Sequence, residues 1–179
     1  MIKVSYPKII ADKRIVRAMA EAEITPRKTL AVVMQRRAIV NRWQSEVWEP
    51  VGVLTDYVGA AEPRILVEEA GATQWLYPGF ELVLRRSEAE GYFHNVSAKE
   101  PRVFILWRME AERAVPQFVT VSYDEASRWM DGGEQVDSVA MPAALFAWTG
   151  EFVEKNYRAE PKKRIRPQSF LSPKDRART

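Results

Sequence analysis

The sequence predicts a mainly β (α+β) fold, an antiparallel sheet or partly open barrel of about six to eight strands packed by a C-terminal helix. From Thr29 onward, short segments with the two-residue period of strands alternate with turn residues. A single long helical pattern follows residue 28, from Pro142 to about Tyr157. Strands joined by short turns favour antiparallel pairing, and a helix this apolar has to cover an open side or end of the sheet.

Composition divides the chain into three parts. A length of 179 residues suits one ordinary domain. We expect an N-terminal extension over 1–28, a single globular domain over 29–157 and a basic, disordered tail over 158–179, where prolines and charges leave little to bury. In the extension, 7–24 form a candidate helix, and Met19 is an alternative translation start. The apolar stripe of that helix consists of Ile15, Ala18, Met19 and Ala22.

The sequence of the first half of the domain predicts four strands. Pro50 lies in the second strand and indicates an edge position or a bulge, because proline has no N–H to donate. The small residues around Gly71 separate the third and fourth strands and predict a hairpin. These four strands are Leu30–Val40, Val47–Leu54, Arg64–Glu69 and Thr73–Tyr77.

The second half predicts further strands and one short helical turn. Pro78-Gly79 suits a type II turn, since proline presets φ and glycine accepts a positive φ. Ser87–Gly91 has the spacing of a single capped turn of helix. The third strand of this half is apolar on both faces and is therefore expected at the centre of a sheet. The strands are Phe80–Leu84, Tyr92–Ser97, Arg102–Met109 and Gln117–Tyr123.

Two helices are predicted near the end of the domain. Ser122 and Glu125 have capping-box spacing and open a short helix that ends after Asp131 at two glycines. Pro142 suits the first position of the longer helix. Gly150 costs about 1 kcal/mol relative to alanine in such a helix, so we expect another backbone to approach it closely. The buried stripe of this helix consists of Leu145, Trp148 and Phe152.

The composition excludes several classes of protein. The chain has no cysteine, which excludes disulfides, thiolate nucleophiles, cysteine-ligated zinc and iron–sulfur clusters held by the chain itself. No apolar run approaches the roughly 20 residues that cross a bilayer, and the N-terminus lacks a signal-peptide pattern. We therefore expect a cytoplasmic protein without membrane insertion.

Charge is strongly segregated along the chain. Residues 1–42 carry ten Lys or Arg against three Asp or Glu, a net +7. Residues 43–157 carry nine against nineteen, a net −10, and residues 158–179 carry eight against two, a net +6. The overall charge of +3 therefore gives no support to a basic nucleic-acid-binding domain.

No residue emerges as catalytic, cofactor-binding or metal-binding. His94 is the only histidine, which rules out a multi-histidine metal site, and we expect it to be structural or on the surface of a strand. Asp131, Glu134 and Asp137 lack the spacing of a calcium loop. The glycine-rich phosphate motifs of nucleotide-binding proteins are missing. No cofactor is predicted.

The densest basic cluster lies in the tail. It can contact phosphate, an acidic partner or the acidic domain of its own chain, and specific nucleic-acid recognition is the weaker alternative because no aromatic residues interleave with the cations. We predict that the tail docks on an acidic protein partner. The residues at its centre are Lys162, Lys163, Arg164 and Arg166.

Several stretches together resemble a family of uncharacterised bacterial proteins, a domain of unknown function encoded beside molybdenum-dependent formate dehydrogenase genes. The resemblance covers roughly residues 30–165 and assigns no catalytic or cofactor residue. It is carried by Asn41-Arg42-Trp43, 48–53, 75–80, 88–92, Val103 to Met109, 114–116, 131–137, Pro142 and Trp148 to Tyr157.

The resemblance implies a context for function. We expect a non-catalytic accessory protein that binds a partner during maturation, assembly or regulation of a formate dehydrogenase, with its subunits or maturation factors as the partners. Two alternatives stay open: a nucleic-acid-associated protein that uses the basic termini, and a small-molecule-binding barrel or an undetected enzyme.

Overall fold

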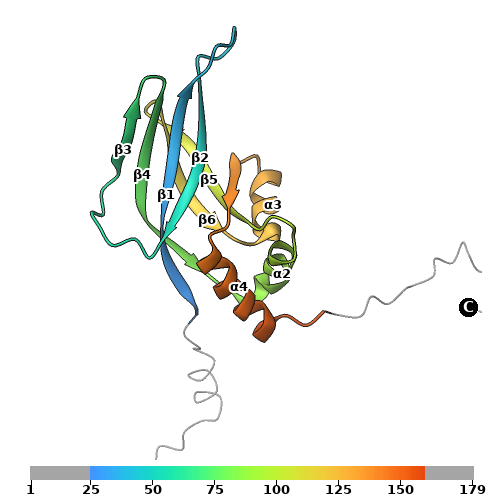
Figure 1. Ribbon diagram of the computed structural model, residues 1–179. Coiled ribbons are helices and arrows are strands. Elements are labelled where there is room, and N and C mark those ends of the chain that lie inside the picture. Colours follow the sequence, from blue (N-terminus) through green and yellow to red (C-terminus); the bar gives the residue numbers. More distant parts are fainter. Residues whose placement is uncertain (1–24, 160–179) are drawn as a thin grey trace, which may run out of the picture.

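The computed structural model describes residues 25–159 (Figure 1). The described chain forms seven strands, one short 3-10 helix and three α-helices. The strands are β1 (Arg27–Ala38), β2 (Glu46–Thr55), β3 (Arg64–Glu69), β4 (Ala72–Val83), β5 (Arg102–Glu110), β6 (Arg113–Thr120) and β7 (Val136–Ala140). The helices are η1 (Arg86–Glu88), α2 (Ala89–Val96), α3 (Tyr123–Asp131) and α4 (Ala143–Asn156).

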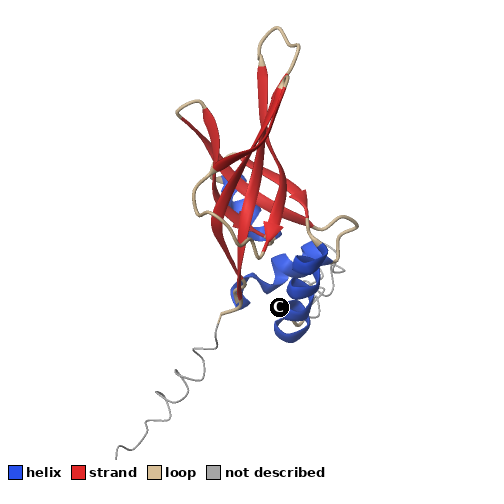
Figure 2. Cartoon of the chain, turned by 60° about the vertical axis from the view of Figure 1, so that its left-hand side comes forward, coloured by secondary structure: helices blue, strands red, loops and turns tan. Residues whose placement is uncertain are grey.

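The strands form two antiparallel sheets, which confirms the predicted mainly β class. Sheet A has the order β2-β1-β4-β3, and sheet B has the order β6-β5-β7. The two sheets face each other, with β2 beside β7 and β4 beside β6, so that they enclose a core without closing into a barrel (Figures 1 and 2). As predicted, the strand at 102–110 is the central strand of its sheet.

Alternation along β1 explains why this strand lies inside sheet A. Leu30, Val32 and Met34 are fully buried and belong to the main core. Ala31 and Val33 point to the opposite face and pack with Leu76 in a second small cluster. Apolar side chains on both faces are typical of a strand in the interior of a sheet, and β1 lies between β2 and β4. The main core covers one face of β1, and Tyr57 packs on the small cluster of the other face.

Two bulges adjust the register of β1 with its partners. On the β2 side, Val33 pairs with Gly52 and Met34 with Pro50, which leaves one extra residue on the edge strand β2. The prediction for Pro50, an edge position or a bulge, is thus confirmed on both counts. On the β4 side, Gly79 has φ of +90°, and the register shifts beside it. The turn predicted at Pro78-Gly79 is wrong: the positive φ serves a bulge inside one continuous strand.

The three α-helices gather at one end of the molecule, opposite the end of the β1–β2 hairpin (Figure 1). The helix α3 begins as predicted, with the Ser122 hydroxyl accepting a hydrogen bond from the N–H of Glu125 at 3.1 Å. The helix α4 also follows the prediction, with Leu145 and Phe152 buried, although Pro142 is its N-cap and not its first residue. Trp148 is only half-buried and packs at the margin of the core.

The segment from Ser87 to Ser97 differs from its prediction. The expected single turn and the expected strand at 92–97 are wrong, because η1 and α2 form one nearly continuous helical stretch through both. Gly91 does not end the helix. A Cβ at Gly91 would lie 2.3 Å from the Ser122 hydroxyl oxygen, so glycine is required here for close packing of α2 against the start of α3.

Three further predictions need correction or lie beyond the described residues. No atom would meet a Cβ at Gly150, so the expected close backbone approach is wrong. The strand β7 was not predicted from its short sequence. The candidate helix at 7–24 and most of the basic tail fall outside the described residues. None of the helices within 25–159 is long and apolar enough to span a membrane.

Candidate functional site

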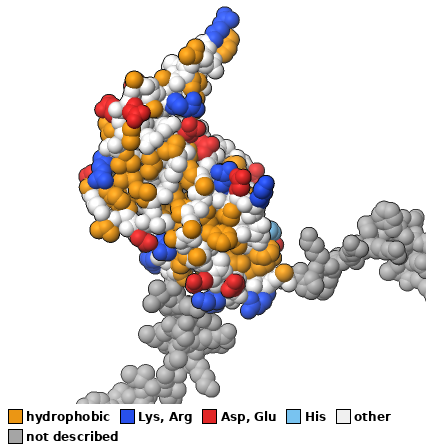
Figure 3. All heavy atoms as spheres, viewed as in Figure 1, with side chains coloured by type: hydrophobic (Ala, Val, Ile, Leu, Met, Phe, Trp, Pro, Cys, Tyr) orange, Lys and Arg blue, Asp and Glu red, His pale blue; other side chains and the backbone are white. Residues whose placement is uncertain are grey.

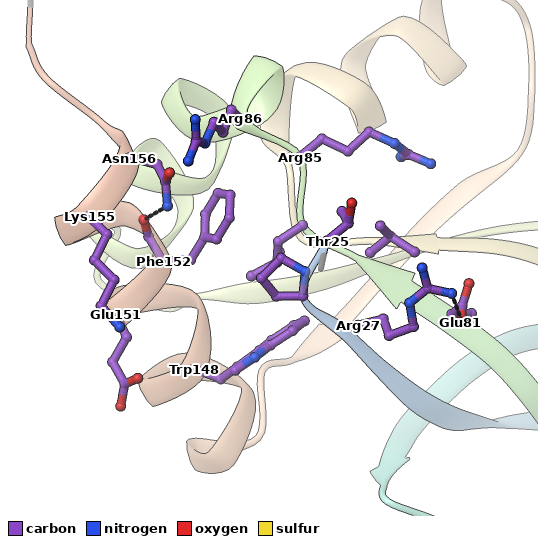
Figure 4. A pocket seen from close by; sticks show the side chains of 13 residues that line it. Thr25, Arg27, Glu81, Arg85, Arg86, Trp148, Glu151, Phe152, Lys155 and Asn156 are labelled. Atoms are coloured by element: carbon purple, nitrogen blue, oxygen red, sulfur yellow. Dashed lines mark hydrogen bonds and ion pairs between the residues drawn. The ribbon is translucent and has the colours of Figure 1, made fainter. Parts of the chain in front are cut away.

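A groove of about 930 Å³ opens at the helical end, between α4, the start of β1 and the end of β4 (Figure 4). Val83, Leu84 and Phe152 provide apolar lining, and the half-buried Trp148 forms one wall. The remaining lining residues are Thr25, Pro26, Arg27, Glu81, Arg85, Arg86, Glu151, Lys155 and Asn156. Four of them are basic and two are acidic, so the groove has a positive balance.

Backbone and aromatic contacts fix the shape of this groove. The N–H of Leu84 donates to the carbonyl of Pro26 at 3.0 Å, which joins the end of β4 to the start of β1. The Tyr92 ring packs edge-on against Phe152, with 5.8 Å between the ring centroids. The Tyr92 hydroxyl accepts from the N–H of Arg85 at 3.1 Å, and burial raises the pKa of Tyr92 to about 12. The groove is therefore built on rigid elements.

The charged side chains of the groove differ in their pairing. Arg27 forms an ion pair with Glu81 at 3.1 Å. Within residues 25–159, the side chains of Arg85 and Lys155 form neither a hydrogen bond nor an ion pair, and both are exposed. Figure 4 shows Lys155 on the α4 side and Arg85 on the β4 side. Two cations that have no polar side-chain partner among the described residues thus flank the apolar lining of the groove.

A second hollow of about 300 Å³ continues from the groove along β4. It shares Glu81, Val83 and Arg85 with the groove. Phe118 and Trp129 close its other side, with their ring centroids 6.3 Å apart. The β4 register explains the opening: β3 pairs with β4 only as far as Leu76, so the later part of β4 has no strand on that side.

A buried polar network holds α2 behind the groove. The Asn95 side chain is fully buried and donates to the carbonyls of Arg102 at 2.7 Å and Val121 at 2.8 Å. Its oxygen accepts from the N–H of Arg102 at 2.9 Å. Nearby, Glu88 accepts from the Ser122 hydroxyl at 2.8 Å and pairs with Arg128 at 2.7 Å. These groups are satisfied, so their role is to fix the helices to sheet B.

The opposite end of the molecule carries a second candidate surface. The β1–β2 hairpin extends beyond the other strands (Figure 2). Its hairpin tip, residues 39–45, places large apolar side chains in solvent. Val40 is fully exposed and Trp43 is 86% exposed. The Arg42 guanidinium lies 5.3 Å from the centre of the Trp43 ring, within cation–π range. A tryptophan this exposed contributes little to the core of its own domain.

The outer face of sheet A also carries exposed apolar side chains. Figure 3 shows hydrophobic side chains gathered over this face of the molecule. Tyr57, from the loop after β2, packs on the small outer cluster, and Arg64 lies 5.6 Å from its ring centre. Every residue of β3 is exposed. The partly exposed apolar side chains of β2 and β3 are Val51, Leu54, Ile65, Leu66 and Val67.

A comparison with known protein families gives a match that covers most of the chain. A family model described as a protein of unknown function, DUF3305, matches residues 29–166. The chain belongs to this family. No curated protein and no solved structure matches the chain. The predicted membership in a family of unknown function is thus confirmed, and its genetic link to formate dehydrogenase stays a prediction.

The acidic residues after α3 in this DUF3305 domain have structural partners. Asp137 accepts a hydrogen bond from the indole N–H of Trp107 at 2.7 Å. Glu134 pairs with Arg108, whose hydrogen bonds lower the pKa of the Glu134 carboxyl. Asp131 is the exposed last residue of α3. No group of three or more His, Asp or Glu side chains within 25–159 is arranged to hold a metal ion.

Of the remaining sequence-based candidates, one lies on α2 and the others lie outside the described chain. His94 is exposed on α2, not on a strand as predicted, and its ring lies 6.0 Å from that of Phe93. The tail residues Lys162, Lys163, Arg164 and Arg166 fall outside the described residues. Sequence reasoning missed the exposure of Trp43. A tryptophan between turn residues, outside any strand pattern, was the available signal.

Proposed function

We propose that this DUF3305 chain is a non-catalytic accessory protein that binds a protein partner through the hairpin tip. The observation that carries the proposal is the exposure of Trp43 and Val40 at the end of a protruding hairpin. Tryptophan and arginine are enriched among residues that dominate binding energy at interfaces. A tip that presents Trp43 beside Arg42 has this composition.

The hairpin is held in place before any partner binds. Arg36 pairs with Glu46 at 3.8 Å and Arg37 with Glu49 at 3.5 Å, along the stem of the hairpin. The N–H of Ala38 donates to the carbonyl of Gly71 at 2.7 Å, which ties the stem to the β3–β4 turn. Because these contacts order the stem, binding costs less conformational entropy than it would for a free loop.

The context that we propose is the maturation, assembly or regulation of a formate dehydrogenase. Its support is the resemblance of this sequence to proteins encoded beside formate dehydrogenase genes. The structural partners of Glu134, Asp137 and Glu88 favour a scaffold role for these carboxylates over acid–base chemistry. We assign the partner to the subunits or maturation factors of that enzyme.

The basic tail adds a second contact in this proposal. Residues 158–179 carry a net charge of +6, and Arg42 at the hairpin tip adds another cation. Attraction between such charges and an acidic partner acts over about one Debye length, near 8–10 Å at ordinary salt. The tail residues Lys162, Lys163, Arg164 and Arg166 would therefore steer an acidic partner, while the apolar tip supplies the specific contact.

Co-expression with the formate dehydrogenase subunits of the source cell tests the proposal. The Trp43→Ala variant should capture at least about tenfold less of these subunits, since hot-spot truncation costs 2 kcal/mol or more. Val58→Ala is the matched control, because Val58 is 98% exposed on a different loop. Equal capture by both variants would overturn the role of the tip. Retention of nucleic acid in place of these subunits would favour the nucleic-acid alternative.

A further inference from the structure

The groove at the helical end lies where the described chain begins. Thr25 and Pro26 are themselves lining residues, and Pro26 is fixed by its hydrogen bond with Leu84. The residues that precede Thr25 are therefore attached directly to the groove, without an intervening linker. A tethered segment meets such a surface at a high effective concentration, so that weak contacts are enough to hold it.

The groove offers two kinds of contact to such a segment. Its apolar lining includes Leu84, Phe152 and the half-buried ring of Trp148. Arg85 and Lys155 lack polar partners within residues 25–159 and flank this lining (Figure 4). A complementary occupant therefore has small or apolar side chains together with negative charge.

The sequence immediately before the groove has this composition. Residues 18–24 read Ala-Met-Ala-Glu-Ala-Glu-Ile, with two glutamates, no lysine and no arginine. The cations of the N-terminal extension all lie at or before Arg17 within residues 1–24. By contrast, residues 160–179 carry seven Lys or Arg against two acidic residues, so this segment would meet the groove with charge of the same sign.

We propose that the groove is the docking site for residues 18–24 of the same chain. Glu21 and Glu23 approach Arg85 and Lys155, while Met19 and Ile24 contact the apolar lining. Seven residues span at most about 25 Å when extended and about 10 Å as a helix, so in either conformation the segment stays close to the groove from its attachment at Thr25. This inference is independent of the partner proposed for the hairpin tip at the other end of the molecule.

Hydrogen exchange of the purified full-length protein tests this proposal. Backbone amides of residues 19–24 should exchange at least about tenfold more slowly than those of the same sequence in an unstructured peptide. In the double variant Arg85→Glu/Lys155→Glu this protection should disappear. The control Lys99→Glu/Arg113→Glu changes two exposed cations elsewhere and should keep it.

Reversing the charges on both sides keeps the test decisive if the double variant loses protection for another reason. Adding Glu21→Lys and Glu23→Lys to Arg85→Glu/Lys155→Glu restores opposite charges and should restore protection of the segment. Exchange of residues 19–24 at the peptide rate in the unmodified protein would overturn the proposal. So would protection that persists in the double variant, or that is lost equally in the control.

Discussion

The two ends of this domain use similar residue types in opposite ways. At the helical end, apolar side chains of α4 enter the core and polar groups such as Asn95 find buried partners. At the hairpin end, Val40 and Trp43 remain in solvent although the chain folds into a well-paired hairpin. The difference indicates that the packing at the helical end stabilises the fold, while the hairpin end presents an exposed apolar surface.

This comparison predicts its largest effect on stability at the helical end. Leu145 is fully buried in the main core, so Leu145→Ala should lower the free energy of unfolding by about 2–5 kcal/mol. Urea denaturation followed by circular dichroism measures the change. Leu54→Ala is a suitable control, because the side chain is 44% exposed on β2 and should cost much less. Equal losses would show that exposure does not distinguish these positions.

The buried polar network should give the next largest effect. Asn95→Ala removes three hydrogen bonds and leaves the carbonyls of Arg102 and Val121 without their side-chain partner. We expect a loss of about 3 kcal/mol, since each unsatisfied buried group costs roughly 1–3 kcal/mol. The same urea titration measures it. A loss below that of an exposed substitution would mean that water replaces the amide and that α2 is held by apolar contacts alone.

Much of the helical end was predictable from the sequence, because its signals are local. The capping pair of Ser122 and Glu125 and the stripe of α4 act within one or two helical turns. The failure at 87–97 has a non-local cause: Gly91 is required by the approach of Ser122, some thirty residues later. The wrong turn at Pro78-Gly79 also has a non-local cause, because the positive φ of Gly79 forms a bulge in the pairing of β4 with β1.

The candidate surfaces were less predictable than the fold. Periodicity identifies which side chains are apolar, but it does not show that the β1–β2 hairpin projects beyond its neighbours and leaves Trp43 uncovered. The groove depends on three segments distant in sequence, the start of β1, the end of β4 and α4. Only their packing brings Arg85 and Lys155 to the same opening.

A pH titration sharpens the comparison at the groove. Burial raises the pKa of Tyr92 to about 12 from its ordinary value near 10. The neutral hydroxyl therefore contributes stability that is fully present below pH 10 and is lost as the pH rises toward 12. Stability measured from pH 9 to pH 12 should fall less steeply in Tyr92→Phe than in the unmodified protein. Identical slopes would place the hydroxyl in contact with solvent.

The smallest effect on stability is expected at the hairpin tip. Val40→Ala and Trp43→Ala should change the free energy of unfolding by no more than about 0.5 kcal/mol, because exposed side chains bury little on folding. Thermal denaturation of both variants checks this. A loss of 2 kcal/mol or more for Trp43→Ala would assign the ring a structural role and would remove the contrast between the two ends.

Hydrogen exchange of the domain with and without its bound partner tests the role of the hairpin tip most directly. If the tip is the contact surface, binding should slow exchange in residues 38–46, while the amides of α2 and α4 at the opposite end keep their rates. Unchanged exchange in 38–46 together with new protection over the helices would contradict the account and would move the interface to the helical end.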